Sequence, residues 1–229
     1  MRILVLVIAS YGKPEYRHME QIWKSRVVPD WCDLWLVHSK PACQWIGDLV
    51  NDSWLDPANV EVDIKEKTMY VKQDECLIPG ILAKTVRALE YFKNCAYDYV
   101  WRTNLSSVLD FQGLYNYCCS IKVPHFYGGY IGEYNDGSIR FASGAGFLMS
   151  ANVLQWLVSN QSLLRWDLID DVAIGAMLEP QYGVVHIDRQ WIQSADKPVN
   201  KNVFHYRCES YMHINTVSYM QHVMRNLPH

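Results

Sequence analysis

A continuous apolar run near the start of the chain, Ile3 to Ala9, constrains the fold more than any other feature. Such a run without polar alternation is typical of a strand that is covered on both faces, as in parallel sheets. The run is too short to cross a membrane, and no signal-peptide cleavage pattern follows it. It ends in Ser10-Tyr11-Gly12, which predicts a loop after a buried first strand.

Apolar strands and amphipathic helices alternate after this run. The clearest helix is expected from Pro79 to Asn94, because its apolar residues recur at three-to-four spacing. Further helices are predicted at 14–23, 111–119, 150–159, 170–178 and 213–225, and strands at 33–39, 60–62, 69–71, 97–101, 126–131, 139–141, 147–149 and 184–187. This alternation predicts an α/β protein, with a mostly parallel central sheet and helices on both faces. We expect residues 1–229 to form one domain.

Local signals refine some of these boundaries. Asn135-Asp136-Gly137 is a strong hairpin-turn signal between two strands. Ser150 is placed to cap the helix that follows it. Asp170 and Asp171 open another predicted helix, where acids interact favourably with the helix dipole. We expect helix capping to be the whole role of Asp170.

Composition and missing motifs exclude several function classes. The net charge is −3 and no basic stripe is present, so nucleic-acid binding is not expected. There is no phosphate-binding P-loop, no GxGxxG after the first strand, no GxSxG and no HExxH. The seven cysteines form no CxxC pair, which favours free thiols in a reducing compartment over disulfides or structural zinc. We therefore expect a cytoplasmic protein, whose Asn-x-Ser sequences are chance matches.

Polar residues gather where predicted strands end. Ligands of open α/β sheets bind at the carboxyl ends of the strands. Three segments lie at such ends, namely Ser10–Arg17, His38–Lys40 and Arg102–Ser106. The third segment could instead be an ordinary turn, with Asn104 or Ser106 capping the next element.

Two later segments also carry candidate chemistry. Gly144 and Gly146 bracket a small residue before an apolar strand, which allows close backbone approach to a ligand or equally tight packing at a bend. Asp171 could act as a general base if it lies at the mouth of a site.

In their order along the chain, these segments resemble the β-1,3-galactosyltransferase and Fringe-type glycosyltransferases. The family's Lys-Thr-Asp-Asp-Asp-Val-Phe-Val is matched by Arg102-Thr-Asn-Leu-Ser-Ser-Val-Leu109, and its Ser-Gly-Gly-Gly-Tyr-Val-Leu-Ser by Ser143-Gly-Ala-Gly-Phe-Leu-Met-Ser150. The family's Glu-Asp-Val with a following Gly is matched by Asp170-Asp-Val-Ala-Ile-Gly175. Its Leu-x-x-Lys-Thr helix is matched by Ile81-Leu-Ala-Lys-Thr85, so the resemblance covers about residues 70 to 180.

This resemblance implies a GT-A type α/β/α sandwich, a nucleotide-sugar donor (a UDP-sugar) and transfer to a glycan hydroxyl with inversion at the anomeric carbon. It implies that Asp171 is the catalytic base. It also implies a wall around the donor or acceptor sugar, formed by Ser143, Gly144, Ala145, Gly146 and Asp170.

The departure from the family lies at the positions that hold Mn²⁺ or Mg²⁺ on the donor diphosphate. Asn104, Leu105 and Ser106 replace the acids, and these ions usually need at least one carboxylate. Transfer without a metal is therefore one expectation. A remnant metal site that includes His205 is another, although a lone histidine is more often structural.

Local groups would then bind the donor, and arginine and lysine can neutralise its phosphates. The predicted donor-binding residues are Ser10, Tyr11, Arg17, Lys84, Arg102, Asn104, Ser106 and His205, and Arg207 is a further candidate cation. Loss of the acids leaves a second hypothesis open, an inactive glycosyltransferase-like module that binds a nucleotide or glycan. A nucleotidyltransferase is a third, weakened by the lack of clustered acids.

Overall fold

The structure is a computed structural model, and it describes residues 1–40, 60–192, 198–208 and 216–227. The first half of the chain contains β1 (Ile3–Ile8), α1 (Pro14–Lys24), β2 (Cys32–Lys40), β3 (Val60–Asp63), β4 (Thr68–Lys72), α2 (Gly80–Phe92), β5 (Tyr99–Asn104) and β6 (Ser107–Leu109). The second half contains α3 (Phe111–Ser120), β7 (Tyr127–Tyr134), β8 (Ile139–Ser150), α4 (Ala151–Ser159), a 3₁₀ turn (Gln161–Leu163), α5 (Asp170–Tyr182), β9 (Val185–His186), β10 (Gln190–Trp191), β11 (His205–Arg207) and α6 (Thr216–Asn226).

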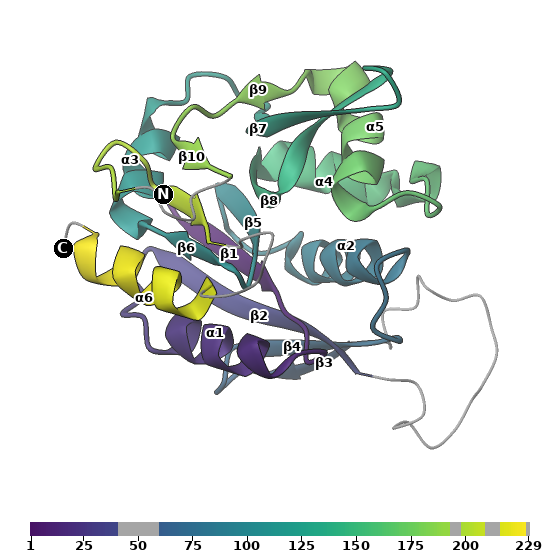
Figure 1. Ribbon diagram of the computed structural model, residues 1–229. Coiled ribbons are helices and arrows are strands. Elements are labelled where there is room, and N and C mark those ends of the chain that lie inside the picture. The colour runs from purple at the N-terminus through teal and green to yellow at the C-terminus, as the bar shows by residue number, and fades with distance from the viewer. Residues whose placement is uncertain (41–59, 193–197, 209–215, 228–229) are drawn as a thin grey trace.

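A large sheet runs through the molecule (Figure 1). Within the described ranges its strand order is β3-β4-β2-β1-β5-β8-β7-β9. The strands β4, β2, β1 and β5 pair in parallel, whereas β8 runs antiparallel to both β5 and β7. A smaller sheet, β10-β11-β6, lies beside it. The predicted parallel centre is confirmed, with antiparallel strands added toward both edges.

Helices cover both faces of the large sheet, so the predicted α/β/α sandwich is confirmed (Figure 1). Buried residues of α2, α4 and α5 pack on one face, which we call the α2 face. Buried residues of α1, α3 and α6 pack on the other, the α1 face. Successive side chains of β1 point to opposite faces of the sheet, so this strand packs against both helix layers. Leu4 and Leu6 pack on the α2 face, and Val5 and Val7 pack on the α1 face.

Several sequence-based boundaries were wrong. The two strands expected at 139–141 and 147–149 are one strand, β8, because the small residues between them extend the chain rather than interrupt it. Strand β5 begins at Tyr99 and continues through Asn104, so residues 102–104 lie inside the strand and not after it. The short strands β6, β10 and β11 were not predicted, since two or three residues give no periodic signal.

Other local expectations have mixed outcomes. The turn at 135–137 is confirmed, and Asn135, Asp136 and Gly137 all have positive φ angles. Ser150 sits at the N-cap of α4 but does not cap it, because its hydroxyl bonds with Phe126 and Pro124 instead. The predicted start of the last helix at His213 lies outside the described residues. No helix in the described ranges combines the length and the apolar character needed to cross a membrane.

Candidate functional site

The carboxyl ends of β1 and β5 lie level with each other, because Ile8 pairs with Asn104 in register. Lys84 of α2 reaches this edge of the sheet. Its Nζ donates to the Ala9 carbonyl at 2.8 Å and to Glu75 Oε1 at 2.7 Å. Lys84 is 1% exposed, and burial lowers its pKa. The edge therefore contains a fixed cation beside the end of the first strand, and its carboxylate partner, Glu75, was missed by the sequence reasoning.

Arg102 of β5 is buried on the α2 face and 1% exposed. Its Nη2 atom donates to Asp170 Oδ2 at 2.5 Å, and Nη1 donates to Asn104 Oδ1 at 2.9 Å and to the Gly144 carbonyl. Thr85 lies 3.4 Å from the same Asp170 oxygen. Arg102 thus links the end of β5, the start of α5 and the middle of β8 in one hydrogen-bonded network.

The backbone of β8 bulges beside Arg102. On the partner strand β7, Gly129 pairs with Phe147 and Ile131 pairs with Ala142, so more residues separate the pairs on β8 than on β7. The extra length includes Ser143, Gly144, Ala145 and Gly146, the segment expected to form a sugar wall. The bulge turns backbone polar groups of this segment away from the sheet ladder and toward side chains.

Asp171 holds the same bulge from the start of α5. Its Oδ2 accepts from the Gly144 N–H at 2.7 Å, and its Oδ1 accepts from the Val172 N–H at 2.9 Å. A Cβ on residue 144 would lie 3.2 Å from both Arg102 Nη1 and Asp171 Oδ2, closer than most Cβ contacts. Glycine at this position therefore lets the acid and the arginine approach the backbone together.

The environment of Asp171 favours its protonated form. The residue is 9% exposed, and burial together with the neighbouring Asp170 raises its pKa to about 6. The Gly144 N–H and Arg102 oppose this rise but do not cancel it. A carboxylate that gains a proton near neutral pH is suited to general acid–base chemistry.

Asp170 is buried, and its described contacts differ from the capping role expected for it. It makes no capping hydrogen bond at α5 and instead forms the ion pair with Arg102. The expectation was wrong because the start of α5 is buried beside Arg102, whose guanidinium offers Asp170 a charged hydrogen-bond partner. Asp170 neutralises Arg102 and leaves Asp171 as the acid that is not ion-paired.

Two expected site residues, Gly146 and His205, contact groups on the opposite, α1 face, where Thr103 also lies. Thr103 donates to the Ala145 carbonyl at 2.7 Å and lies 3.0 Å from His205 Nε2. Gly146 packs against Trp101 and His205. His205 is fully buried, and burial lowers its pKa to about 3, so the ring is neutral. The structure therefore separates His205 from Arg102 and Asp171 by the thickness of the sheet.

The remaining predicted donor residues lie around the ends of β1 and β5. Tyr11 is 48% exposed and stacks on His38 with the ring centroids 4.2 Å apart, and His38 in turn stacks on Tyr70. Ser10 is half-buried and Arg17 is exposed. His38 belonged to a segment named from the sequence, whereas Tyr70 gave no signal, because it comes from a strand far along the chain.

Metal-ligating groups are scarce in the described ranges. No group of three or more His, Cys, Asp or Glu side chains is placed there to hold a metal ion. The amide oxygen of Asn104 accepts a hydrogen bond from Arg102. Ser106 is buried, and residues 104–106 contain no carboxylate. The donors at these positions do not fit a Mn²⁺ or Mg²⁺ site, because both ions favour carboxylate oxygens.

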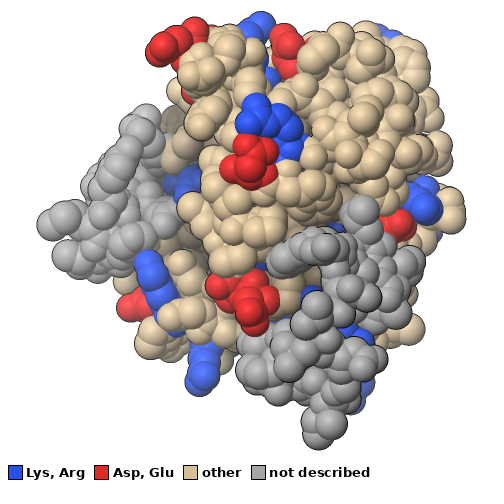
Figure 2. All heavy atoms as spheres, turned by 90° about the vertical axis from the view of Figure 1, so that its right-hand side faces the viewer, with Lys and Arg blue, Asp and Glu red and all other residues tan. Residues whose placement is uncertain are grey.

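The face of the molecule drawn in Figure 2 carries no large positive patch among the coloured atoms. In the view of Figure 2, small groups of Lys and Arg are interspersed with Asp and Glu and separated by uncharged surface.

Three solved structures share a distant likeness with the chain. No protein-family model matches the chain, and no curated protein matches its sequence. The glycosyltransferase GlyE of Streptococcus pneumoniae TIGR4 is 11% identical with a TM-score of 0.47, and its apo form is 14% identical with a TM-score of 0.48. Each match covers 92% of this chain and 55% of that one, so the chain spans about half the length of GlyE.

A third solved structure is a glycosyltransferase involved in the glycosylation of the major capsid of PBCV-1. It is 9% identical, with a TM-score of 0.46, and the match covers 97% of this chain and 100% of that one. At these scores the likeness adds nothing to the architecture described above and carries no information on substrates.

Proposed function

We propose that the protein is a glycosyltransferase that moves a sugar from a nucleotide-diphosphate donor, a UDP-sugar, to a glycan hydroxyl. One observation carries this proposal. Arg102, Gly144 and Asp171 come from three of the four segments that resemble glycosyltransferase motifs, and they form one hydrogen-bonded network near the carboxyl end of β5. Ligand sites of open α/β sheets lie at this edge.

In the proposed reaction, Asp171 is the general base. Its carboxylate takes the proton of the acceptor hydroxyl as that oxygen attacks the anomeric carbon of the donor sugar. The bond from this carbon to the diphosphate breaks, and the nucleoside diphosphate leaves with the electron pair. Attack from the side opposite the leaving group inverts the anomeric configuration.

Asp170 and Arg102 act as positioning residues in this proposal. Their ion pair fixes the start of α5, and Arg102 also holds the Gly144 carbonyl while Asp171 holds the Gly144 N–H. The base is thus anchored to the backbone of the sugar wall, and the geometry is set before substrate arrives.

We further propose that transfer needs no divalent metal, because the groups at residues 104–106 do not suit one. The charge of the leaving diphosphate would then be met by cations at the strand ends. Lys84 lies directly at the end of β1, where its pairing with Glu75 can exchange for a phosphate oxygen. The test is transfer in EDTA compared with transfer in added Mn²⁺, and a strict need for Mn²⁺ would exclude metal independence.

The main test compares Asp171→Asn with Asp167→Asn, an acid of the same type that is exposed and forms an ion pair with Arg165. Loss of a general base lowers the rate by about a hundredfold to ten-thousandfold. We expect Asp171→Asn to lose transfer by that factor while donor binding, measured by isothermal titration, persists. The Asp167→Asn enzyme should transfer normally, and normal transfer by Asp171→Asn would remove this residue from the mechanism.

A second function is favoured by the same contacts. Both oxygens of Asp171 already accept backbone hydrogen bonds, and Arg102 and Lys84 are already paired with acids. A network satisfied in this way suits an inactive module that binds a nucleotide or glycan. Titration with UDP-sugars and GDP-sugars, run beside donor-hydrolysis and transfer assays, separates the two, because binding without turnover on any acceptor identifies the module.

A further inference from the structure

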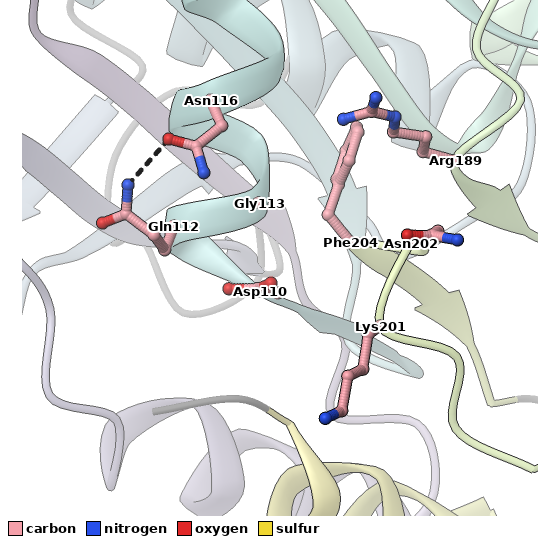
Figure 3. Close-up of a pocket in the computed structure, with 8 residues that line it drawn as sticks. All are labelled: Asp110, Gln112, Gly113, Asn116, Arg189, Lys201, Asn202 and Phe204. Atoms are coloured by element: carbon pink, nitrogen blue, oxygen red, sulfur yellow. Dashed lines mark hydrogen bonds between the residues drawn. The ribbon is translucent and has the colours of Figure 1, made fainter.

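A polar cavity lies beside the start of α3, where Asp110 follows the end of β6 (Figure 3). Its volume is about 320 Å³. The first turns of α3 form one wall, and described residues just before β10 and just before β11 form the other. Its lining residues are Asp110, Gln112, Gly113, Asn116, Arg189, Lys201, Asn202 and Phe204.

Asp110 is the unusual member of this lining. The residue is 8% exposed, yet no described group donates a hydrogen bond to its carboxylate, which does not cap α3. The charge of Arg26 acts on it through space, but the guanidinium of Arg26 donates to the Leu109 carbonyl. Neither carboxylate oxygen is fully buried, so both face the cavity, where water or the hydroxyl of a ligand can donate to them.

The position of this carboxylate is fixed by its neighbours. The Asp110 backbone N–H donates to the Phe204 carbonyl at 2.7 Å, and its carbonyl accepts from Leu114. A Cβ on Gly113 would lie 2.7 Å from Asp110 Oδ2, so the absence of a side chain at 113 leaves room for the carboxylate. The backbone of Asp110 is therefore fixed beside the cavity, and its short side chain places the carboxylate there.

The opposite wall supplies donors. The side chains of Arg189, Lys201 and Asn202 are exposed and line the cavity across from α3 (Figure 3). On α3 the amides of Gln112 and Asn116 bond to each other at 2.9 Å and keep further donor and acceptor atoms free. The cavity therefore presents one fixed acceptor, two cations and several amides around a single space.

We infer that this cavity binds a sugar ring of a glycan, at a place separate from the proposed site of transfer. Vicinal hydroxyls can donate to the Asp110 carboxylate and at the same time accept from Arg189, Lys201 and the amides. A simple anion would satisfy the cations but would leave Asp110 without a donor and would be repelled by it. The volume is at the low end for small-ligand sites, which suits one sugar unit and not a whole nucleotide sugar.

The position of the cavity relates it to the proposed transfer reaction. Strand β6 connects the two places along the chain, since the Ser107 hydroxyl at its start donates to the Ala145 carbonyl at 3.3 Å and Asp110 follows its end. A glycan held in the cavity by one unit is tethered close to the sheet edge, which raises its local concentration there.

The test measures binding of free glucose, galactose and N-acetylglucosamine by saturation-transfer NMR, without any donor present. We expect at least one sugar to bind the wild-type chain, with an affinity about tenfold weaker in Asp110→Asn, because a hydrogen bond to a charged acceptor is lost. Lys201→Met, which changes an exposed side chain and leaves the core intact, should weaken binding as well. Asp136→Asn, on the exposed turn after β7, is the matched control and should bind as the wild type does.

Absence of binding by all three sugars, or equal binding by Asp110→Asn and the wild type, would overturn the inference. Competition in which inorganic phosphate displaces the sugar at equal concentration would also overturn it, because that result describes an anion site. The measurement needs no turnover, so its failure leaves the proposed transfer reaction untouched. Failure of transfer by the wild type would likewise leave this binding site standing.

Discussion

The two faces of β5 use adjacent residues to hold the same bulge of β8 in opposite ways. On the α2 face, Arg102 contacts the Gly144 carbonyl and belongs to a network with two buried acids. On the α1 face, Thr103 holds the Ala145 carbonyl and faces a neutral histidine. The proton transfer proposed for Asp171 needs the charged groups of the α2 face. The neutral groups of the α1 face fix the backbone of β8.

The charged face should show the largest effect on stability. Arg102→Met leaves Asp170 buried without its cation, and breaking a buried pair from one side costs about 3 to 5 kcal/mol. Urea unfolding would measure this loss. Arg165→Met, which removes an exposed pair with Asp167, is the matched control and should leave the midpoint unchanged. Similar midpoints for the two variants would show that the buried network contributes no more than a surface pair.

The next effect is the pH dependence of transfer. Because the Asp171 pKa is raised to about 6, its basic form is lost as the pH falls below that value. The ratio kcat/KM should then fall about tenfold for each further pH unit, as it does for one essential base. The profile of Asp167→Asn should match that of the wild type. A profile that is flat down to the usual range of an aspartate, about pH 4, would contradict the role of Asp171.

Two glycine substitutions compare the faces directly. In Gly146→Ala the new Cβ would lie 2.6 Å from Trp101 and 2.8 Å from His205, whose rings are fully buried. We expect a loss of about 1 to 3 kcal/mol in the free energy of unfolding, as for other overpacked cores.

Gly144→Ala meets Arg102 and Asp171 at 3.2 Å and should cost less stability. Its main effect should be a lower rate of transfer by the folded protein, because it displaces the proposed base. Thermal unfolding and transfer rates of both variants would measure this difference. Equal stability losses in the two variants would contradict the predicted difference between the faces.

The smallest effect concerns the neutral face. Thr103→Val removes a donor to the Ala145 carbonyl and a partner of His205 Nε2, at a cost of about 1 to 2 kcal/mol by urea unfolding. Thr85→Val, which loses only the 3.4 Å contact to Asp170, should cost less. A larger loss for Thr85→Val would mean that the charged face depends on this threonine more than its geometry indicates.

Much of the fold could be predicted because apolar residues in several segments follow the spacing of a strand or a helix. The apolar run of β1, the amphipathic spacing of α2 and the turn at 135–137 each correspond to an observed element. The candidate site was predictable only in part. The sequence named Arg102, Gly144 and Asp171 as separate candidates, but it gave no sign that Glu75 would pair with Lys84 or that Tyr70 would lie against His38.

The sequence by itself determined which residues are apolar, where strands and helices alternate and which polar groups stand near strand ends. Only the tertiary structure decided how these groups are shared between the faces. Strand alternation sends Arg102 and Thr103 to opposite sides, and the bulge in β8 places Gly144 against the acids while Gly146 packs against His205. A bulge changes which face a residue meets without any change in its local pattern, and the pairing of buried charges depends on neighbours far along the chain.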